Sequence, residues 1–290
     1  MEQTIKLTEA PRKVPFTTSL KILFGGFTNQ IGWPIFGLGM VFFWVFSLDS
    51  DLMNLGKFSG QLETTKGKIT AVRATGAIVN GKDVEEYTFE YKTKEGTFEG
   101  QSYSREIQFR KGNNVIVEYV ANNHAFSRIK GLRSAEYGLA TGVLPLVVPL
   151  LGLVMVFIGF TGGLKTKKLL VHGYWAFGKM KGKIATGREI NDQVVYKMNF
   201  GFRGKDGKEY TTVAYTHETH LLEDEDMELL LYNPDDPKDS MMFDSMPGNP
   251  ERDENGEILA VDKSVAFGAL FIPFLAIVGN TIYMIVLFNS

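Results

Sequence analysis

Long apolar stretches alternate along this chain with polar stretches that have a two-residue hydrophobic period. Residues 22–48, 137–164 and 265–289 contain no charged side chain. A bilayer hydrocarbon core about 30 Å thick needs roughly 20 helical residues to cross it, and each stretch exceeds that length. The pattern therefore predicts three transmembrane helices.

The two stretches between these helices have the alternation typical of half-buried β-strands. In the first, residues 68–73, 87–92 and 115–120 alternate between apolar and polar side chains, with turn signals such as Asn80-Gly81 between them. The pattern predicts about five strands, beginning near residues 66, 84, 97, 114 and 125. Five short strands are enough for a small antiparallel barrel or sandwich.

The hydrophobic pattern occurs twice, which indicates an internal duplication. Residues 34–42 and 66–69 (Lys-Gly-Lys-Ile) match residues 149–157 and 181–184, and both pairs are 115 positions apart. We therefore expect residues 66–69 to superpose on residues 181–184, and the strands of the two copies to correspond one to one.

Further matches follow at slightly smaller separations. Asn80 pairs with Asn191, and Tyr119 with Tyr232. Tyr103 pairs with Tyr215. Insertions in surface turns produce such drifts.

The predicted organisation has seven parts. They are an N-terminal tail (1–21), transmembrane helix 1 (22–48), β domain 1 (57–131), transmembrane helix 2 (137–164), β domain 2 (174–246), a polar linker (247–263) and transmembrane helix 3 (265–289). Pro145 and Pro149 leave a second interpretation of helix 2 open, in which it is a re-entrant hairpin. Two full crossings need about 40 residues, so the 28 present favour a single crossing.

The amino-acid composition excludes several kinds of catalytic and binding site. The chain has no cysteine, which excludes disulfides, thiol nucleophiles and thiolate metal sites, and its net charge is −2. The sequence shows no nucleophile with a base, no phosphate-binding glycine loop and no extended basic surface. We therefore predict that it is not an enzyme and that it has no cofactor and no nucleic-acid partner.

His217 and His220 flank a glutamate, as zinc ligands do in metalloproteases. Those ligands are four residues apart on a helix, whereas these are three apart directly after a predicted strand. We interpret them as an incidental polar loop and predict no metal site.

An acidic run in the second copy is the clearest candidate for docking a basic partner. Its residues are Glu223, Asp224, Glu225 and Asp226, and its counterpart in the first copy is basic, Arg110-Lys111. The run lacks the ligand spacing and turn glycine of a calcium-binding EF-hand loop. We interpret the run as a solvated turn, with docking of a basic partner as the alternative.

The motifs of both copies resemble a bacterial family of membrane proteins of unknown function. They are Gly67-Lys-Ile-Thr, the Tyr-x-Phe-x-Tyr strand at 87–91, Ser102-Tyr103-Ser104 and Val115-x-Val-x-Tyr119, with Leu231-Tyr232-Asn233-Pro234 in the second copy. In that family small β domains follow transmembrane helices. The resemblance implies this fold and no chemistry.

These features together predict a non-enzymatic, multi-pass membrane protein acting as a scaffold or accessory subunit through its two β domains. Its partners would be the lipid bilayer, other membrane or envelope proteins, and further copies of the chain. The alternative is a subunit that contributes helices to a larger membrane enzyme or transport complex.

The distribution of basic residues predicts sidedness in a bacterial inner (cytoplasmic) membrane. The N-terminal tail and the flanks of β domain 2 carry eight Lys and Arg, against four at the flanks of β domain 1. Basic residues near membrane ends stay in the cytoplasm. The N-terminus and β domain 2 should therefore be cytoplasmic, with β domain 1 and the C-terminus outside.

Overall fold

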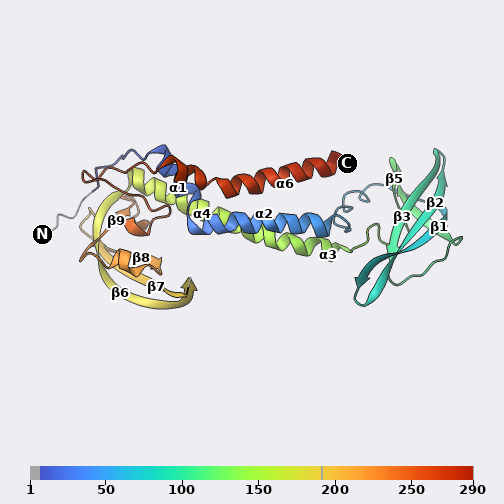
Figure 1. Ribbon diagram of the computed structural model, residues 1–290, viewed down its shortest axis with the longest axis horizontal. Coiled ribbons are helices and arrows are strands. Elements are labelled where there is room, and N and C mark those ends of the chain that lie inside the picture. Colours follow the sequence, from blue (N-terminus) through green and yellow to red (C-terminus); the bar gives the residue numbers. More distant parts are fainter. Residues whose placement is uncertain (1–6, 191, 290) are drawn as a thin grey trace. The chain divides into compact units, whose positions relative to one another are not determined.

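A computed structural model describes residues 7–190 and 192–289 of the chain (Figure 1). The chain forms two compact units. One unit is Gly37–Leu150, and the other combines the residues before and after it. We call the β-sheet of the first unit domain 1 and that of the second unit domain 2.

Three helical segments are long and apolar enough to span a membrane: Phe27–Ser47, Leu139–His172 and Lys263–Leu287. The helices are α1 (Phe16–Phe24), α2 (Phe27–Ser47), α3 (Leu139–Val143), α4 (Val147–His172), α5 (Lys263–Gly268) and α6 (Phe271–Asn289). A 3₁₀ turn, η1 (Leu144–Leu146), joins α3 to α4, so the chain continues in one direction past both prolines. Residues 139–172 therefore form a continuous helical run and not the re-entrant hairpin that the prolines left open.

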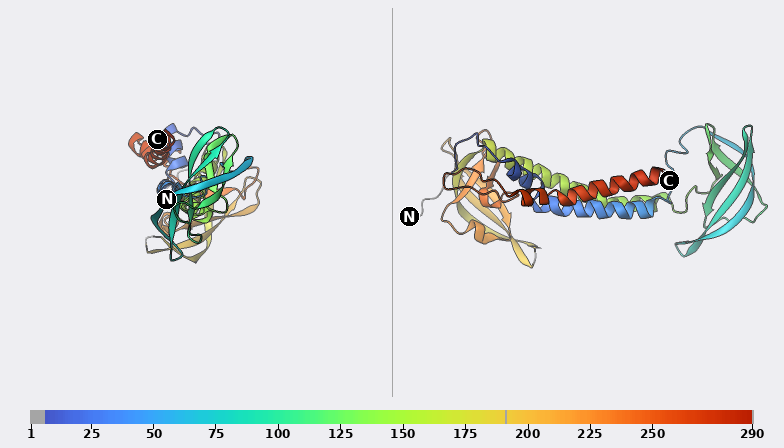
Figure 2. Two further views of the ribbon diagram at one scale, coloured as in Figure 1. Left: turned by 90° about the vertical axis from the view of Figure 1, so that its right-hand side faces the viewer. Right: turned by 45° about the horizontal axis from the view of Figure 1, so that its top comes forward.

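Domain 1 is one antiparallel sheet in the order β3-β2-β1-β4-β5. Its strands are β1 (Leu62–Val79), β2 (Lys82–Thr93), β3 (Gly96–Ser104), β4 (Asn114–Val120) and β5 (Asn123–Ile129). The sheet is strongly curved (Figure 2), and its edge strands β3 and β5 approach each other. The Ile129 N–H donates to Ser102 Oγ at 2.7 Å, and Tyr103 and Arg133 exchange two backbone hydrogen bonds. Among the described residues no continuous ladder joins β3 to β5, so neither a closed barrel nor a two-sheet sandwich forms.

Domain 2 repeats this topology in the order β8-β7-β6-β9-β10. Its strands are β6 (Tyr174–Ile190), β7 (Gln193–Arg203), β8 (Glu209–Thr216), β9 (Glu228–Tyr232) and β10 (Ser240–Met242), with short 3₁₀ helices η2 (Thr219–Leu222) and η3 (Phe243–Ser245). Read in chain order, each strand has the same neighbours as its counterpart. The one-to-one correspondence of strands is confirmed.

The pairing register corrects one expected match. Gly67 pairs with Val115 and Gly178 with Glu228, so Gly67 corresponds to Gly178. The register shifts agree, because they fall at Ile69/Ala71 in β1 and at Met180/Gly182 in β6. Superposing residues 66–69 on 181–184 is therefore wrong by four residues, whereas matching Tyr119 with Tyr232 is confirmed.

The cores of the two domains are built from strand residues that point inward. Domain 1 buries an aromatic row, Tyr87, Phe89 and Tyr91, against Val117 and Tyr119. Domain 2 has its own row at the same places, with Met198, Phe200 and Phe202 among the buried residues. Alternation in the sequence marks these faces in both copies.

Domain 2 differs because its β9 strand is buried on both faces. Leu229 and Leu231 pack against Leu169 and Leu170 at the end of α4. The corresponding residues of β4 are Ile116, which is 55% exposed, and Glu118. A strand covered on both faces loses its alternation, which explains the run Leu229-Leu230-Leu231.

The two copies also join helix to sheet differently. In the first copy, a series of turns covers residues 48–60 between α2 and β1. In the second copy only Gly173 separates α4 from β6. The second helix therefore continues past Leu164 to His172, where its last turns form part of the core.

Close packing holds α2 against α4 within the second unit. A Cβ added at Gly32 would lie 2.7 Å from Val156 N, and one at Gly159 would lie 2.7 Å from Asn29 N. Asn29 is fully buried and donates to the Val156 carbonyl at 3.2 Å, while Trp33 Nε1 donates to Asn29 Oδ1 at 3.0 Å. Small residues that allow such approach, with a satisfied amide between them, are typical of membrane helix pairs.

The described part of the N-terminal tail packs against α4 and the predicted linker within the second unit. Arg12 is 6% exposed, and its Nη1 donates to the Leu170 and Gly173 carbonyls at 3.1 and 2.8 Å. Carbonyls in the last turn of a helix have no partner within it, so Arg12 supplies one for α4. Thr18 similarly fixes the predicted linker through Leu259 O, at 2.6 Å.

Candidate functional site

The two histidines of the second copy lie between β8 and the end of η2. Among the described residues no group of three or more His, Cys, Asp or Glu is placed to hold a metal ion. His217 instead lines a surface groove, and His220 is exposed.

The candidate docking residues lie in corresponding loops of two different units. Arg110 and Lys111 are exposed between β3 and β4, and Glu223–Asp226 are exposed between β8 and β9. Glu223 is already paired, because Lys183 Nζ lies 2.9 Å from its carboxylate oxygens, and this contact lowers the Glu223 pKa. A partner would compete with Lys183 for this carboxylate.

A buried carboxyl lies directly after this loop. Glu228 is 3% exposed and corresponds to Val115 of domain 1, a core residue. Burial raises the pKa of Glu228 to about 7, and the nearby Asp224 and Asp244 add to the rise. Burial also raises the pKa of Asp244. Glu228 is therefore only partly ionised near neutral pH.

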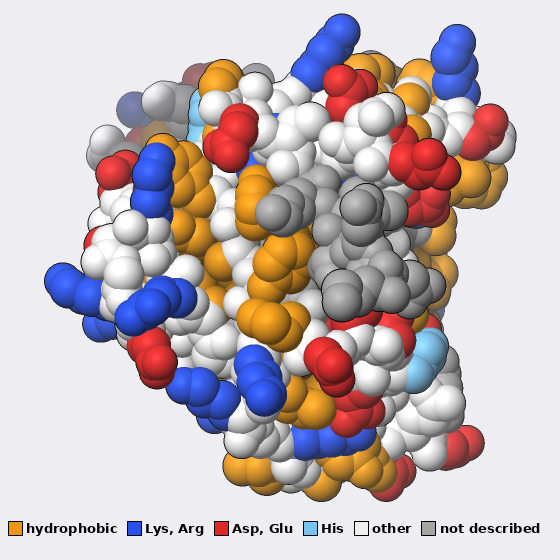
Figure 3. Space-filling view, turned by 90° about the vertical axis from the view of Figure 1, so that its left-hand side faces the viewer, with side chains coloured by type: hydrophobic (Ala, Val, Ile, Leu, Met, Phe, Trp, Pro, Cys, Tyr) orange, Lys and Arg blue, Asp and Glu red, His pale blue; other side chains and the backbone are white. Residues whose placement is uncertain are grey.

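The face of the second unit drawn in Figure 3 shows acidic and basic side chains interspersed around apolar ones. No single sign of charge dominates this face.

Each unit contains a groove where its sheet meets an apolar helix. The groove of the first unit has a volume of about 590 Å³. It is lined by residues 79–80 at the β1–β2 turn, 103–107 after β3, 131–133 after β5, and 138–141 at the start of α3. The groove of the second unit has a volume of about 740 Å³ and includes Ile190, residues 215–218 and residues 244–249.

The same short segment lines both grooves. Pairing of Tyr87 with Ser102 and of Met198 with Ala214 makes residues 103–106 (Tyr-Ser-Arg-Glu) correspond to residues 215–218 (Tyr-Thr-His-Glu). In both copies the hydroxyl at the second position accepts a backbone N–H, from Glu106 and from Glu218. These hydroxyls stabilise the turn in both copies, whereas the side chain at the third position differs, Arg105 in one copy and His217 in the other.

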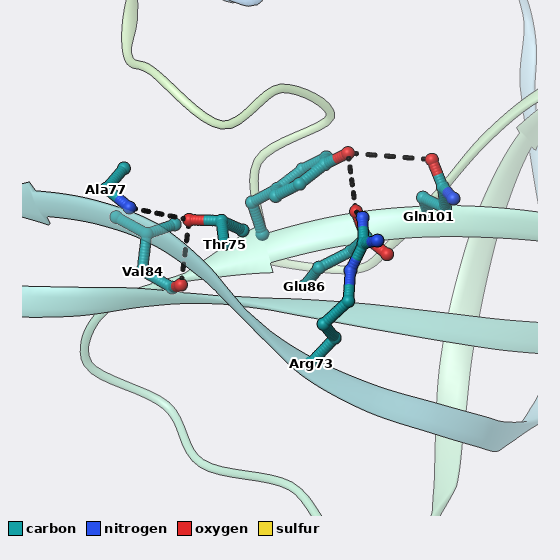
Figure 4. A network of polar contacts seen from close by, with 7 residues as sticks. Arg73, Thr75, Ala77, Val84, Glu86 and Gln101 are labelled. Atoms are coloured by element: carbon teal, nitrogen blue, oxygen red, sulfur yellow. Dashed lines mark hydrogen bonds and ion pairs between the residues drawn. The ribbon is translucent and has the colours of Figure 1, made fainter.

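A polar network supports the groove of the first unit (Figure 4). Tyr103 donates to Glu86 Oε2 at 3.3 Å, and Arg73 Nη2 lies 2.9 Å from the same oxygen. Burial and the Glu86 charge raise the pKa of Tyr103 to about 12, so its hydroxyl remains protonated. The network fixes the tyrosine ring beside the groove.

Two arginines line this groove, and neither is among the predicted docking residues. Arg105 Nε lies 3.4 Å from Glu106 Oε1. Arg133 Nη2 is buried and has no hydrogen-bond partner within the described part of the chain. The groove is formed by four segments that are far apart in the sequence. The repeated segment that begins with Tyr103 and Tyr215 is the one sequence feature that could have indicated it.

Comparisons with known proteins identify no family for this chain. No family model matches it, and no curated protein matches it. One solved structure that it resembles is a replication protein A heterotrimer bound to single-stranded DNA, with 8% identity and a TM-score of 0.18. The match covers 62% of this chain and 45% of that one, so this chain spans less than half of that chain's length.

This match contradicts the prediction that excludes nucleic acid as a partner, and we withdraw that exclusion. The prediction rested on the absence of a basic surface in the sequence. A likeness at this TM-score carries no argument for binding. The contact network and the charges of the described residues remain the basis for assigning a role.

Proposed function

We propose that this chain is a non-enzymatic, multi-pass membrane protein that acts as an accessory or interaction subunit through its two β domains. The order of elements carries the proposal. Domain 1 lies between α2 and α3, and domain 2 lies between α4 and α5. A single apolar helical run therefore separates the two domains along the chain.

Three crossings by these helices deliver domain 1 and domain 2 to opposite faces of the membrane. The basic residues near the ends of the spans favour a cytoplasmic N-terminus and domain 2, with domain 1 and the C-terminus outside. One protein would then offer the same small fold to two compartments. The opposite charges of residues 110–111 and 223–226 equip the two copies for different ligands.

Single cysteines at corresponding positions test this arrangement. Lys82 and Gln193 are exposed and occupy the same place in the β1–β2 and β6–β7 turns, whereas Asn191 lies outside the described residues. The natural chain has no cysteine, so Lys82→Cys and Gln193→Cys each introduce the only thiol. In spheroplasts, whose cytoplasmic membrane is intact, a membrane-impermeant maleimide should label Lys82→Cys. Gln193→Cys should react only after permeabilisation, and labelling of both variants in intact cells would overturn the proposal.

A further inference from the structure

The groove of the first unit lies where an apolar span begins. Its wall at residues 138–141 overlaps the start of the span Leu139–His172. Leu139, Leu144 and Val147 are 43%, 71% and 48% exposed, so an apolar surface leads away from the groove. In a membrane the groove would lie at headgroup depth, with this surface facing acyl chains.

The charges that line the groove favour an anion. Arg105 and Arg133 are its basic residues, and Glu106 is its acidic one. Asp49, Glu86 and Glu136 act on Tyr103 from the neighbouring elements, and Arg73 and Tyr103 already share Glu86. The lining itself keeps an excess of one positive charge.

Arg133 is fixed by its backbone hydrogen bonds, while one nitrogen of its guanidinium group has no acceptor among the described residues. Its backbone pairs with Tyr103, and its Nη1 would lie 3.4 Å from a Cβ added at Gly138. The guanidinium therefore lies against the first residues of the span, while its buried Nη2 has no protein acceptor among the described residues. An unpaired buried donor costs free energy that a phosphate oxygen would recover.

We propose that this groove binds the headgroup phosphate of an anionic phospholipid, with Arg105 and Arg133 as its ligands and the acyl chains along α3 and the start of α4. The proposal rests on the membrane-spanning assignment made under the proposed function. A lipid fits better than a soluble phosphate because the groove continues into an exposed apolar surface. Arginine guanidinium groups recognise phosphate oxygens through charge-assisted hydrogen bonds.

The corresponding groove of the second unit provides an internal contrast. There His217 occupies the position of Arg105, and Lys21 is accompanied by Glu218 and Asp244. The lining has no excess of fixed positive charge. The proposal therefore concerns domain 1 alone, and His217→Gln should leave lipid retention unchanged.

The test is native mass spectrometry of the full chain in neutral detergent, titrated with phosphatidylglycerol or with phosphatidylcholine. We expect the wild type to retain one phosphatidylglycerol selectively. Arg105→Gln/Arg133→Gln should weaken retention about tenfold or more, the effect of losing charge-assisted hydrogen bonds. Arg110→Gln/Lys111→Gln removes two charges from an exposed loop of the same domain and should match the wild type.

Equal retention by the groove variant and the loop control would overturn the proposal. If the double variant fails to fold, Arg105→Gln alone decides, because its side chain is part-exposed and its loss should still reduce retention. Inorganic phosphate or a short single-stranded oligothymidylate that displaced the lipid at equal phosphate concentration would overturn the choice of a lipid. A chain that enters neither micelles nor vesicles would instead defeat the membrane assignment itself.

Discussion

Single polar side chains join distant segments of this fold by donating hydrogen bonds to backbone carbonyls. Arg12 supplies hydrogen-bond donors to the end of α4 from a segment more than a hundred residues earlier in the chain. Asn29 places its own buried amide in a hydrogen bond to the Val156 carbonyl across a close helix contact. Both residues look like ordinary polar residues in the sequence, because the groups they serve become neighbours only after folding.

Replacing Arg12 should therefore destabilise the second unit. Arg12→Ala leaves two carbonyls at the end of α4 without their buried donor, which costs about 1–3 kcal/mol. Thermal unfolding in detergent should show a lower Tm. Lys13→Ala removes the same charge from an exposed neighbour and should leave Tm unchanged. Equal effects of the two substitutions would show that the capping contacts contribute nothing.

Glu228 should make the stability of domain 2 depend on pH. Its pKa is about 7 in the folded protein against 4.5 for an ordinary glutamate, so the folded state binds the proton more tightly. Stability is then greatest below pH 4.5 and falls as the pH rises to 7, by at most about 3 kcal/mol at 1.4 kcal/mol per pKa unit. Tm should decline between pH 5 and pH 8.

Glu228→Gln should flatten this decline and raise Tm at pH 8, since the carboxylate no longer has to be buried as an ion. Glu189→Gln, an exposed substitution in β6, is the matched control and should retain the wild-type slope. A wild-type Tm that does not change between pH 5 and pH 8 would contradict the raised pKa.

At the scale of elements, the approach of α2 to α4 depends on particular glycines. Gly159→Val would place side-chain atoms against the Asn29 backbone, which lies 2.7 Å from an ideal Cβ. Overpacking of this kind costs about 1–3 kcal/mol and should lower Tm in detergent. Gly162→Val is the control in the same helix, because nothing lies within 4 Å of its Cβ position. If both valines are tolerated equally, the helix contact is not as close as described.

The sequence predicts the elements better than it predicts their register. Alternation predicts the strands and the aromatic rows, and the match of Tyr119 with Tyr232 is confirmed. The repeat of Lys-Gly-Lys-Ile was misleading, because a shift of four residues preserves the two-residue period and only the bulges after Ile69 and Met180 fix the pairing. The grooves could not be predicted, since Arg105 and Arg133 meet only when the edges of the sheet approach.

For the whole molecule, the orientation in the membrane should depend on the basic residues at the end of α4. Replacing Lys165, Lys167 and Lys168 by Gln leaves five of the eight basic residues on the side proposed to be cytoplasmic, against four on the other side. In the Gln193→Cys background, a fraction of the chain should then become labelled in intact cells. Lys205→Gln/Lys208→Gln/Lys238→Gln removes three exposed charges from domain 2 and should leave the labelling pattern unchanged. An unaltered pattern in both variants would show that other residues set the orientation.

The direct joint between α4 and β6 has a mechanical consequence. Leu169 and Leu170 belong to both the helix and the core beneath β9, and Gly173 alone separates the helix from the sheet. If α4 spans a bilayer as proposed, tilting of the helix in a thinner bilayer would turn the sheet joined to it. In the first copy a series of turns at residues 48–60 lies between α2 and β1, in place of a single residue. A change in bilayer thickness would thus change the angle between domain 2 and the membrane more directly than the angle between domain 1 and the membrane.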